Sequence, residues 1–288
     1  AGKREFLNTV TTVQPFQLPR DPEGPHYVSI DWTGTHDDIS QPVDHPALQA
    51  WAVQTLDKIK AAGFKGLGAW SHPVFHTLDV PVTRDLNLWA WVPGPDRRLY
   101  SPGWRETIEV AMKTQVVPLK DNTNLVGYYT DNELDWTDSV SPSGYFNGLA
   151  PTDPNRMQVM KVLRTLWPDV ELFNADWQTS LTSLDEIDAW TEMPHTPVYN
   201  KFFSAWLEHL ARDYFQITSE LVRQYDPNHL VLGVRYKGWA PPEVVRASRG
   251  LTDVQSLNYY VADAKLDQEQ FRMVYEASDQ PLIISEYA

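Results

Sequence analysis

Short apolar stretches alternate along the chain with longer stretches in which apolar residues recur every three or four positions. The short stretches are rich in β-branched and aromatic residues, which favours buried strands, and the longer ones have the period of amphipathic helices. Strands are predicted at 27–32, 64–70, 86–91, 125–129, 230–236, 254–260 and 281–286. Helices are predicted at about 46–62, 104–114, 154–166 and 200–224.

The helix at 46–62 has well-marked ends. Pro46 lies in its first turn and Gly63 follows its last, which are the positions that these two residues favour. The apolar residues between them are spaced to cover one face of the helix, so this segment is expected to pack against a sheet.

Nearly continuous apolar strands separated by helices are typical of a parallel sheet with both faces covered. For a chain of 288 residues the (β/α)8 TIM barrel is the α/β form that fits best, and an open doubly wound sheet is the alternative. We expect a single catalytic barrel domain over 1–288, with a long insertion at about 137–199. Because no eighth strand follows Glu286, the barrel is expected to be incomplete at its C-terminus.

Charge and composition exclude several classes of function. The net charge is −14 and no cluster of Lys and Arg interrupts it, so nucleic acids and anionic membranes are poor partners and a neutral substrate fits better. The absence of cysteine excludes disulfides, thiolate metal sites and a cysteine nucleophile. No nucleophile elbow, P-loop or dinucleotide fingerprint is present, which disfavours serine hydrolases, P-loop NTPases and nicotinamide enzymes.

The sequence contains 12 Trp, 13 Tyr and 10 Phe, which is compatible either with an aromatic core or with a cleft whose rings stack on sugars. No run of 18 apolar residues is present, so no membrane-spanning helix is expected. The first residues, 1–5, do not form the apolar part of a signal peptide. The sequence leaves the oligomeric state open.

Two carboxylates follow predicted strands. Asp131-Asn132-Glu133 ends the fourth strand and Glu286 ends the seventh, and barrels place catalytic groups at these strand ends. Retaining glycosidases need two carboxyl groups about 5 Å apart, one as acid/base and one as nucleophile. Asn132 is placed to bind the sugar 2-hydroxyl, a contact that strengthens in the transition state. The pattern therefore predicts a retaining glycoside hydrolase.

The sequence also resembles the clan of barrel glycosidases that carry Asn-Glu on strand four and Glu on strand seven, and within it the beta-agarases of glycoside hydrolase family 50. The stretches that carry the likeness are 63–71, 86–89, 125–134 and 281–287. The family also carries an N-terminal β-sandwich-like module and an eighth strand, and neither is visible in this sequence.

The resemblance implies cleavage of β-1,4-galactosidic linkages in agarose or neoagaro-oligosaccharides, with exo action, no cofactor and no metal. It implies that Glu133 is the acid/base and Glu286 the nucleophile. Tyr260 ends a segment, 256–260, that matches the strand whose last Tyr touches the nucleophile. A secreted enzyme, extracellular or periplasmic, is expected.

Further substrate contacts are expected around this pair. Arg235 is predicted to lie in the cleft or in an ion pair beside Glu286. His72 and His76 have the spacing of zinc ligands on a helix, but Pro73 disfavours a helix there, so binding of a sugar hydroxyl is the better prediction. The remaining candidates are Asp31, Trp70, Asn87, Trp177 and Asn258.

Two alternatives remain open. The segment 172–179 resembles an insertion of family 42 beta-galactosidases, with Phe173 intervening and Gln178 in place of Gly, so a beta-galactosidase of the same clan is possible. A non-catalytic carbohydrate-binding barrel is the alternative from another class. Oligosaccharide binding without product would identify it.

Overall fold

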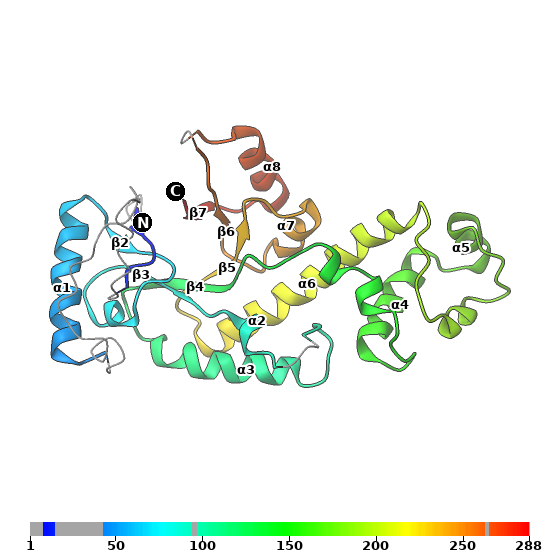
Figure 1. The fold of residues 1–288 in the computed structure, drawn as a ribbon, viewed down its shortest axis with the longest axis horizontal. Helices are drawn as coiled ribbons and strands as arrows, with labels where there is room; N and C mark the ends of the chain where they lie inside the picture. Colours follow the sequence, from blue (N-terminus) through cyan, green and yellow to red (C-terminus); the bar gives the residue numbers. More distant parts are fainter. Residues whose placement is uncertain (1–7, 15–42, 94–96, 263–264, 288) are drawn as a thin grey trace, which may run out of the picture. The chain divides into compact units, whose positions relative to one another are not determined.

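The computed structural model describes residues 8–14, 43–93, 97–262 and 265–287 (Figure 1). The predicted strand at 27–32, and Asp31 with it, lies outside the described residues. Contacts group the chain into two compact units, one of residues 1–85 and 121–128 and one of 86–120 and 129–288. Strand β4 begins in the first unit and ends in the second.

The described strands form one seven-stranded sheet in chain order. The pairings β1–β2, β2–β3, β5–β6 and β6–β7 are parallel. This consecutive order confirms the parallel α/β prediction, and it argues against a doubly wound sheet, in which the strand order reverses at a switch point. The strands are β1 Thr9–Val10, β2 Gly66–Leu67, β3 Val82–Asp85, β4 Leu125–Asn132, β5 Leu230–Lys237, β6 Gln255–Asn258 and β7 Leu282–Glu286.

The first unit contains β1 to β3, the start of β4, helix α1 (Pro46–Ala61) and the 3-10 turn η2 (Pro73–Thr77). Helix α1 matches its prediction, and it buries Trp51 against Phe75 with ring centroids 5.5 Å apart. At Gly66 a Cβ atom would lie 2.8 Å from the carbonyl oxygen of Pro81. Glycine is therefore required where the chain before β3 approaches β2.

The second unit contains the end of β4, strands β5 to β7 and most of the helices. These are α2 Leu88–Trp91, α3 Trp104–Gln115, α4 Pro154–Leu166, α5 Val170–Trp177, α6 Tyr199–Tyr225, α7 Pro242–Ser248 and α8 Gln268–Ser278. Short 3-10 turns occur at η3 Val117–Leu119, η4 Asp138–Val140, η5 Ser143–Tyr145 and η6 Leu184–Ala189. The long helix α6 packs against α3, α4 and α7, with a buried face along its length.

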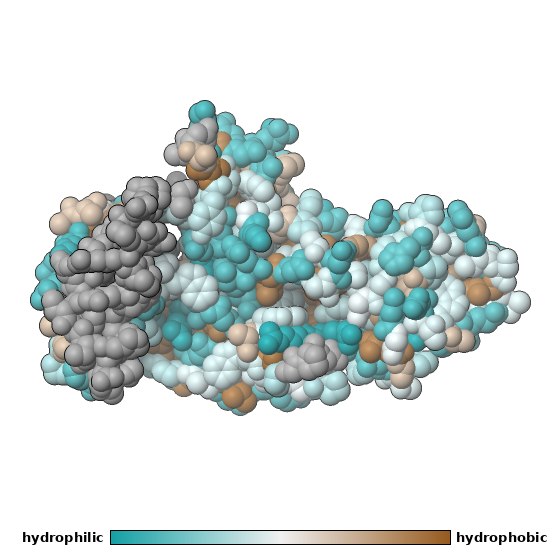
Figure 2. Space-filling view, viewed as in Figure 1, coloured by the Kyte–Doolittle hydropathy of each residue, from teal (hydrophilic) through white to brown (hydrophobic). Residues whose placement is uncertain are grey.

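None of the described helices combines the length and the apolar character that a membrane crossing requires. On the face drawn in Figure 2, exposed apolar side chains of the described residues are scattered among polar ones.

The predicted strand at 86–91 is wrong. The strand lies earlier, at β3, and residues 88–91 form the short helix α2. Asn87 adopts a left-handed conformation with φ of 48°, which turns the chain between the two elements. The backbone N–H of Leu86 still donates to the carbonyl of Tyr129, so the apolar run begins beside the sheet and then leaves it.

The insertion at 137–199 has a core of its own. Trp177 is fully buried, stacks on Phe173 with centroids 5.3 Å apart and meets Trp167 edge-on at 5.4 Å. The expectation that Trp177 contacts substrate is therefore corrected, since its ring is enclosed by other aromatic rings and presents no face to solvent.

Candidate active site

The C-terminal ends of β4 to β7 bring half of the predicted site residues together in the second unit. In the parallel register Lys237 pairs with Asn258, and Asn258 pairs with Glu286. The backbone N–H of Glu133 donates to the carbonyl of Arg235 at 2.8 Å, which links β4 to β5. The four strand ends therefore carry their polar side chains side by side.

Asn258 holds the predicted acid/base. Its side-chain Nδ2 donates to Oδ1 of Asn132 and to Oε1 of Glu133, both at 3.0 Å. The hydroxyl of Ser285 donates to Oδ1 of the same amide at 2.9 Å, so the orientation of the amide is fixed from both ends. Asn258 is fully buried, which strengthens these bonds by excluding water.

A β-bulge makes this arrangement possible. Leu257 pairs with Ile284, but Asn258 pairs with Glu286, so Ser285 is the extra residue on β7. Bulges commonly re-aim side chains next to active sites. Here the bulge lets Ser285 reach Asn258 while Glu286 still takes the last position of the strand.

Arg235 holds the predicted nucleophile. Its Nη1 donates to Oε2 of Glu286 at 2.9 Å, and its guanidinium carbon lies 5.5 Å from the centre of the Tyr129 ring. Arg235 is fully buried, whereas the Glu286 side chain is 21% exposed. Glu286 thus has a permanently charged partner, Arg235, and part of its carboxylate is exposed. Both features suit a carboxylate that attacks a substrate.

The pKa of Tyr260 is affected by both carboxylates. The pKa of its phenol is raised to about 12, first by desolvation, then by its hydrogen bond to Glu286 and by the charges of Glu286 and Glu133, with Arg235 opposing. Tyr260 itself is 54% exposed and is therefore accessible to a ligand.

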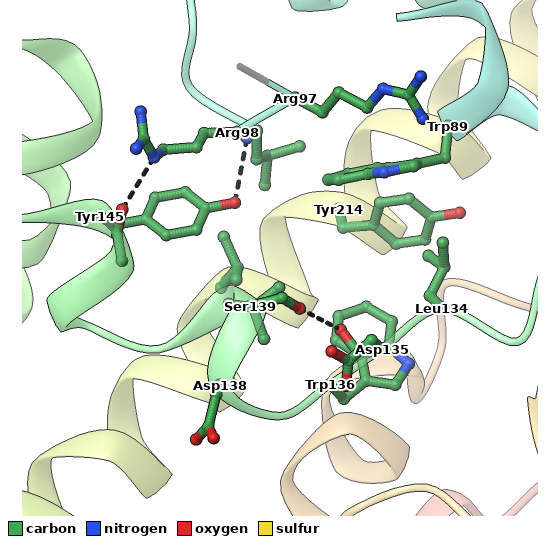
Figure 3. Close-up of a pocket in the computed structure, with 14 residues that line it drawn as sticks. Trp89, Arg97, Arg98, Leu134, Asp135, Trp136, Asp138, Ser139, Tyr145 and Tyr214 are labelled. Carbon is green, nitrogen blue, oxygen red and sulfur yellow. Dashed lines mark hydrogen bonds between the residues drawn. The ribbon is translucent and has the colours of Figure 1, made fainter. Parts of the chain in front are cut away.

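The chain turns sharply at Glu133, whose φ of 49° is in the left-handed region. For a residue other than glycine this conformation costs on the order of 1 kcal/mol and is most common at functional sites. Residues 134–136 then leave the sheet and line a cavity of about 490 Å³ (Figure 3).

Asp131 connects the walls of this cavity to the strand that carries Glu133. Its Oδ1 accepts from the backbone N–H of Trp89 at 2.9 Å, and its Oδ2 accepts from the hydroxyl of Tyr214 at 2.6 Å. Burial raises the pKa of Asp131 to about 7, and the two hydrogen bonds oppose that rise. The sequence marks Asp131 as part of a strand-end motif but assigns it no role.

The candidates in the first unit make contacts within that unit. The backbone N–H of Trp70 donates to Oδ2 of Asp85 at 2.9 Å, and Trp70 has a φ of 62°. His72 begins η2, because its Nδ1 accepts from the N–H of Val74 at 3.1 Å. Burial, then the charges of Arg84 and His72, lower the pKa of His76 to about 4. Substrate binding by Trp70, His72 and His76 stays a prediction.

Across the described ranges, no group of three or more His, Asp or Glu side chains is arranged to hold a metal ion. His72 precedes a 3-10 turn and His76 lies within it, so the two are not on the α-helix on which their spacing would suit zinc. Asn87 lies in the turn before α2, two residues from Trp89, and its contact with substrate also stays a prediction.

The chain is similar to curated beta-agarases. It is 27% identical to Beta-agarase A and 23% identical to Beta-agarase B, both from Vibrio sp. (strain JT0107), with 84% of this chain covered in each alignment. The chain spans 27% of the length of each relative. No protein-family model matches the chain.

Solved structures show the same likeness. The crystal structure of the agarase AgWH50C superposes with a TM-score of 0.70 at 25% identity, covering 84% of this chain and 37% of that one. The structure of PfGH50B gives a TM-score of 0.72 at 26% identity, covering 85% and 38%. The predicted resemblance to beta-agarases is thereby confirmed.

Proposed function

We propose that this chain is a retaining glycoside hydrolase that cleaves β-1,4-galactosidic linkages of agarose or neoagaro-oligosaccharides. The observation that carries the proposal is the pair of carboxylates at the C-terminal ends of β4 and β7, Glu133 held by Asn258 and Glu286 held by Arg235. The similarity to beta-agarases supports the choice of substrate.

The reaction takes two steps. In the first, Glu286 attacks the anomeric carbon while Glu133 gives its proton to the glycosidic oxygen, so the leaving sugar departs with a new hydroxyl and the other sugar remains bonded to Glu286. In the second, Glu133 removes a proton from water, the water oxygen attacks the anomeric carbon, and the bond to Glu286 breaks. One water is consumed and the anomeric configuration is retained.

The neighbouring residues have distinct tasks in this cycle. Arg235 orients Glu286 and stabilises its negative charge, and the same carboxylate raises the pKa of the Tyr260 phenol. The Nδ2 of Asn258 donates to Oδ1 of Asn132, so the Oδ1 is already hydrogen-bonded. The Nδ2 of Asn132 would then donate to the sugar 2-hydroxyl. That contact would strengthen as positive charge develops on the ring.

We also propose that the sheet is part of an incomplete (β/α)8 barrel and that the enzyme is exo-acting. The consecutive order of the strands supports the barrel. A polymeric substrate cannot cross a membrane intact, which supports action outside the cytoplasm. The net charge of −14 suits a neutral polysaccharide.

The beta-galactosidase alternative receives no specific support from the segment 172–179. Asn174 in this segment closes the end of α5, because its Oδ1 accepts from the Thr179 hydroxyl at 2.7 Å and from the N–H of Leu181 at 2.9 Å. The segment therefore has a structural task.

The experiment is digestion of agarose and of a galactose-only β-glycan by the parent and by Glu286→Gln, with products resolved by size. We expect a neoagaro-disaccharide from agarose with the parent and none with the variant. Glutamine is preferable to alanine because it keeps an oxygen facing the buried Arg235. Galactose released from the other glycan, or no product from either, would contradict the proposal.

A further inference from the structure

The side chain of Asn258 connects the end of β4 to the end of β7. Its Nδ2 carries two hydrogens and meets two acceptors, Oδ1 of Asn132 and Oε1 of Glu133, each at 3.0 Å. Its Oδ1 accepts from the Ser285 hydroxyl at 2.9 Å. Asn258 has no exposed surface and Ser285 is 5% exposed, so water does not compete for these bonds. Both ends of the amide are therefore bonded to protein groups.

The orientation of this amide has to suit both charge states of Glu133. If the amide were reversed, its oxygen would face Oε1 of Glu133, and two acceptors would meet whenever the carboxyl is ionised. Glu133 must be ionised when it removes a proton from water in the second step. With Nδ2 toward Glu133, the same hydrogen bond forms to the carboxylate and to the carbonyl oxygen of the protonated acid. The amide therefore need not turn during the reaction.

The carboxyl of Glu133 extends from a fixed backbone. The N–H of Glu133 donates to the carbonyl of Arg235 at 2.8 Å, and the residue has a left-handed φ of 49°. The Glu133 side chain is half-buried, whereas Asn258 is fully buried. Oε1 is therefore the oxygen on the buried side of the carboxyl, and Asn258 distinguishes it from Oε2.

We propose that Asn258 is a positioning residue that keeps the acid proton of Glu133 on Oε2, and that Ser285 holds the amide in place. The carbonyl oxygen of a protonated carboxyl is a better acceptor than its hydroxyl oxygen, so the N–H of Asn258 favours Oε1 as the carbonyl. This inference rests on the proposed function, because it uses Glu133 as acid and base. In the first step the O–H bond at Oε2 breaks, and the glycosidic oxygen receives the proton as its bond to the anomeric carbon breaks. In the second step Oε2 takes a proton from water, whose oxygen bonds to the anomeric carbon.

The kinetic test compares a leaving group that needs a proton with one that needs little help from an acid. Neoagarohexaose releases a sugar, whereas neoagarobiose with a β-fluoride at its reducing end releases fluoride. Asn258→Asp keeps the shape of the side chain and removes both N–H donors, so the proton of Glu133 is drawn to the buried side. We expect kcat/KM to fall at least tenfold more on neoagarohexaose than on the fluoride, because acid catalysis contributes about 10²–10⁴-fold.

Ser285→Ala is the second variant, which keeps the inference testable if Asn258→Asp does not fold. It removes the donor to the buried Oδ1 of Asn258, and kcat/KM should fall about tenfold on neoagarohexaose and less than about twofold on the fluoride. Ser256→Ala is the matched control, because Ser256 is also buried in a strand and its hydroxyl donates to the carbonyl of Leu232 at 2.8 Å. It should leave the ratio of the two kcat/KM values unchanged. Equal losses on both substrates, a larger loss on the fluoride, or no loss in either test variant would overturn the inference.

Neutron diffraction from crystals of the parent in D2O at acidic pD separates this inference from the proposed function, because it needs no turnover. If the parent hydrolyses neither substrate, the proposed function fails, and the deuterium positions still test the hydrogen-bond arrangement. We expect the deuterated nitrogen of Asn258 to face Glu133 and the carboxyl deuterium to lie on Oε2. Deuterium on Oε1, or a reversed amide, would overturn the inference, and the amide orientation is visible whether or not Glu133 carries deuterium.

Discussion

Replacement of Asp131 by asparagine is predicted to remove a pH dependence from the stability of the protein. Asp131 is 4% exposed, and burial raises its pKa to about 7. Asparagine has the same shape, can accept from the N–H of Trp89 with its oxygen and can donate to the Tyr214 hydroxyl with its nitrogen. The substitution therefore removes the titration and keeps the packing.

The magnitude follows from the difference between folded and unfolded protein. The pKa of Asp131 is 3.8 at its ordinary value and about 7 in the fold, so the folded state holds the proton more tightly. The free energy of unfolding must therefore fall as pH rises from about 4 to about 7, and this contribution is constant above that range. The loss is on the order of 4 kcal/mol, a large part of a typical stability of about 5–15 kcal/mol.

The assay is urea unfolding of the parent and of Asp131→Asn at several pH values between 4.5 and 8. We expect the variant to gain stability relative to the parent as pH rises, by several kcal/mol over this range. Asp138→Asn is the control, because it makes the same chemical change at an exposed position. Parallel curves for Asp131→Asn and the parent would refute the reasoning, since they would mean that Asp131 has the same charge in both states throughout.

Three further substitutions test the site and the core. Ser285→Ala releases one end of the Asn258 amide, so kcat on neoagarohexaose should fall about tenfold with little change in KM or Tm, and an unchanged kcat would contradict this role. Arg235→Met removes one partner of a largely buried ion pair and should lower the free energy of unfolding, measured in urea, by about 3 kcal/mol. This value is at the low end for a buried pair because Glu286 keeps some contact with water. No loss would show that the pair is dispensable. Trp177→Ala should destabilise by about 3–5 kcal/mol without raising KM, and a raised KM at unchanged Tm would return Trp177 to the substrate surface.

The sequence predicts the second half of the sheet better than the first. Strands β4, β5 and β7 coincide closely with apolar runs because buried parallel strands need such runs. The strands β1 and β2 contain two residues each, which is too short for a period to be visible. The strand β3 reads Val-Thr-Arg-Asp, and the more apolar run after it is a helical turn, so hydrophobicity alone selects the wrong segment.

The site could be predicted in part for a similar reason. Carboxylates at the ends of apolar strands stand out in a sequence, so Glu133 and Glu286 can be proposed as the catalytic pair before the fold is known. The role of Ser285 depends on a bulge that shifts the register by one residue, and no spacing rule reveals it. The role of Asp131 depends on a backbone N–H from α2 and a hydroxyl from α6, which only the fold brings together. The abundance of aromatic residues in the sequence does not show whether Trp177 lies in a core or in a substrate cleft.

The central claim is that Glu286 forms a bond with the sugar while Glu133 acts as acid and base. The most direct measurement is mass spectrometry of peptides from protein incubated with a 2-deoxy-2-fluoro derivative of neoagarobiosyl fluoride, which slows the second step and accumulates the intermediate. The account predicts a glycosyl adduct on the peptide that contains Glu286. An adduct on another carboxylate, or turnover whose first product has the inverted anomeric configuration, would contradict it.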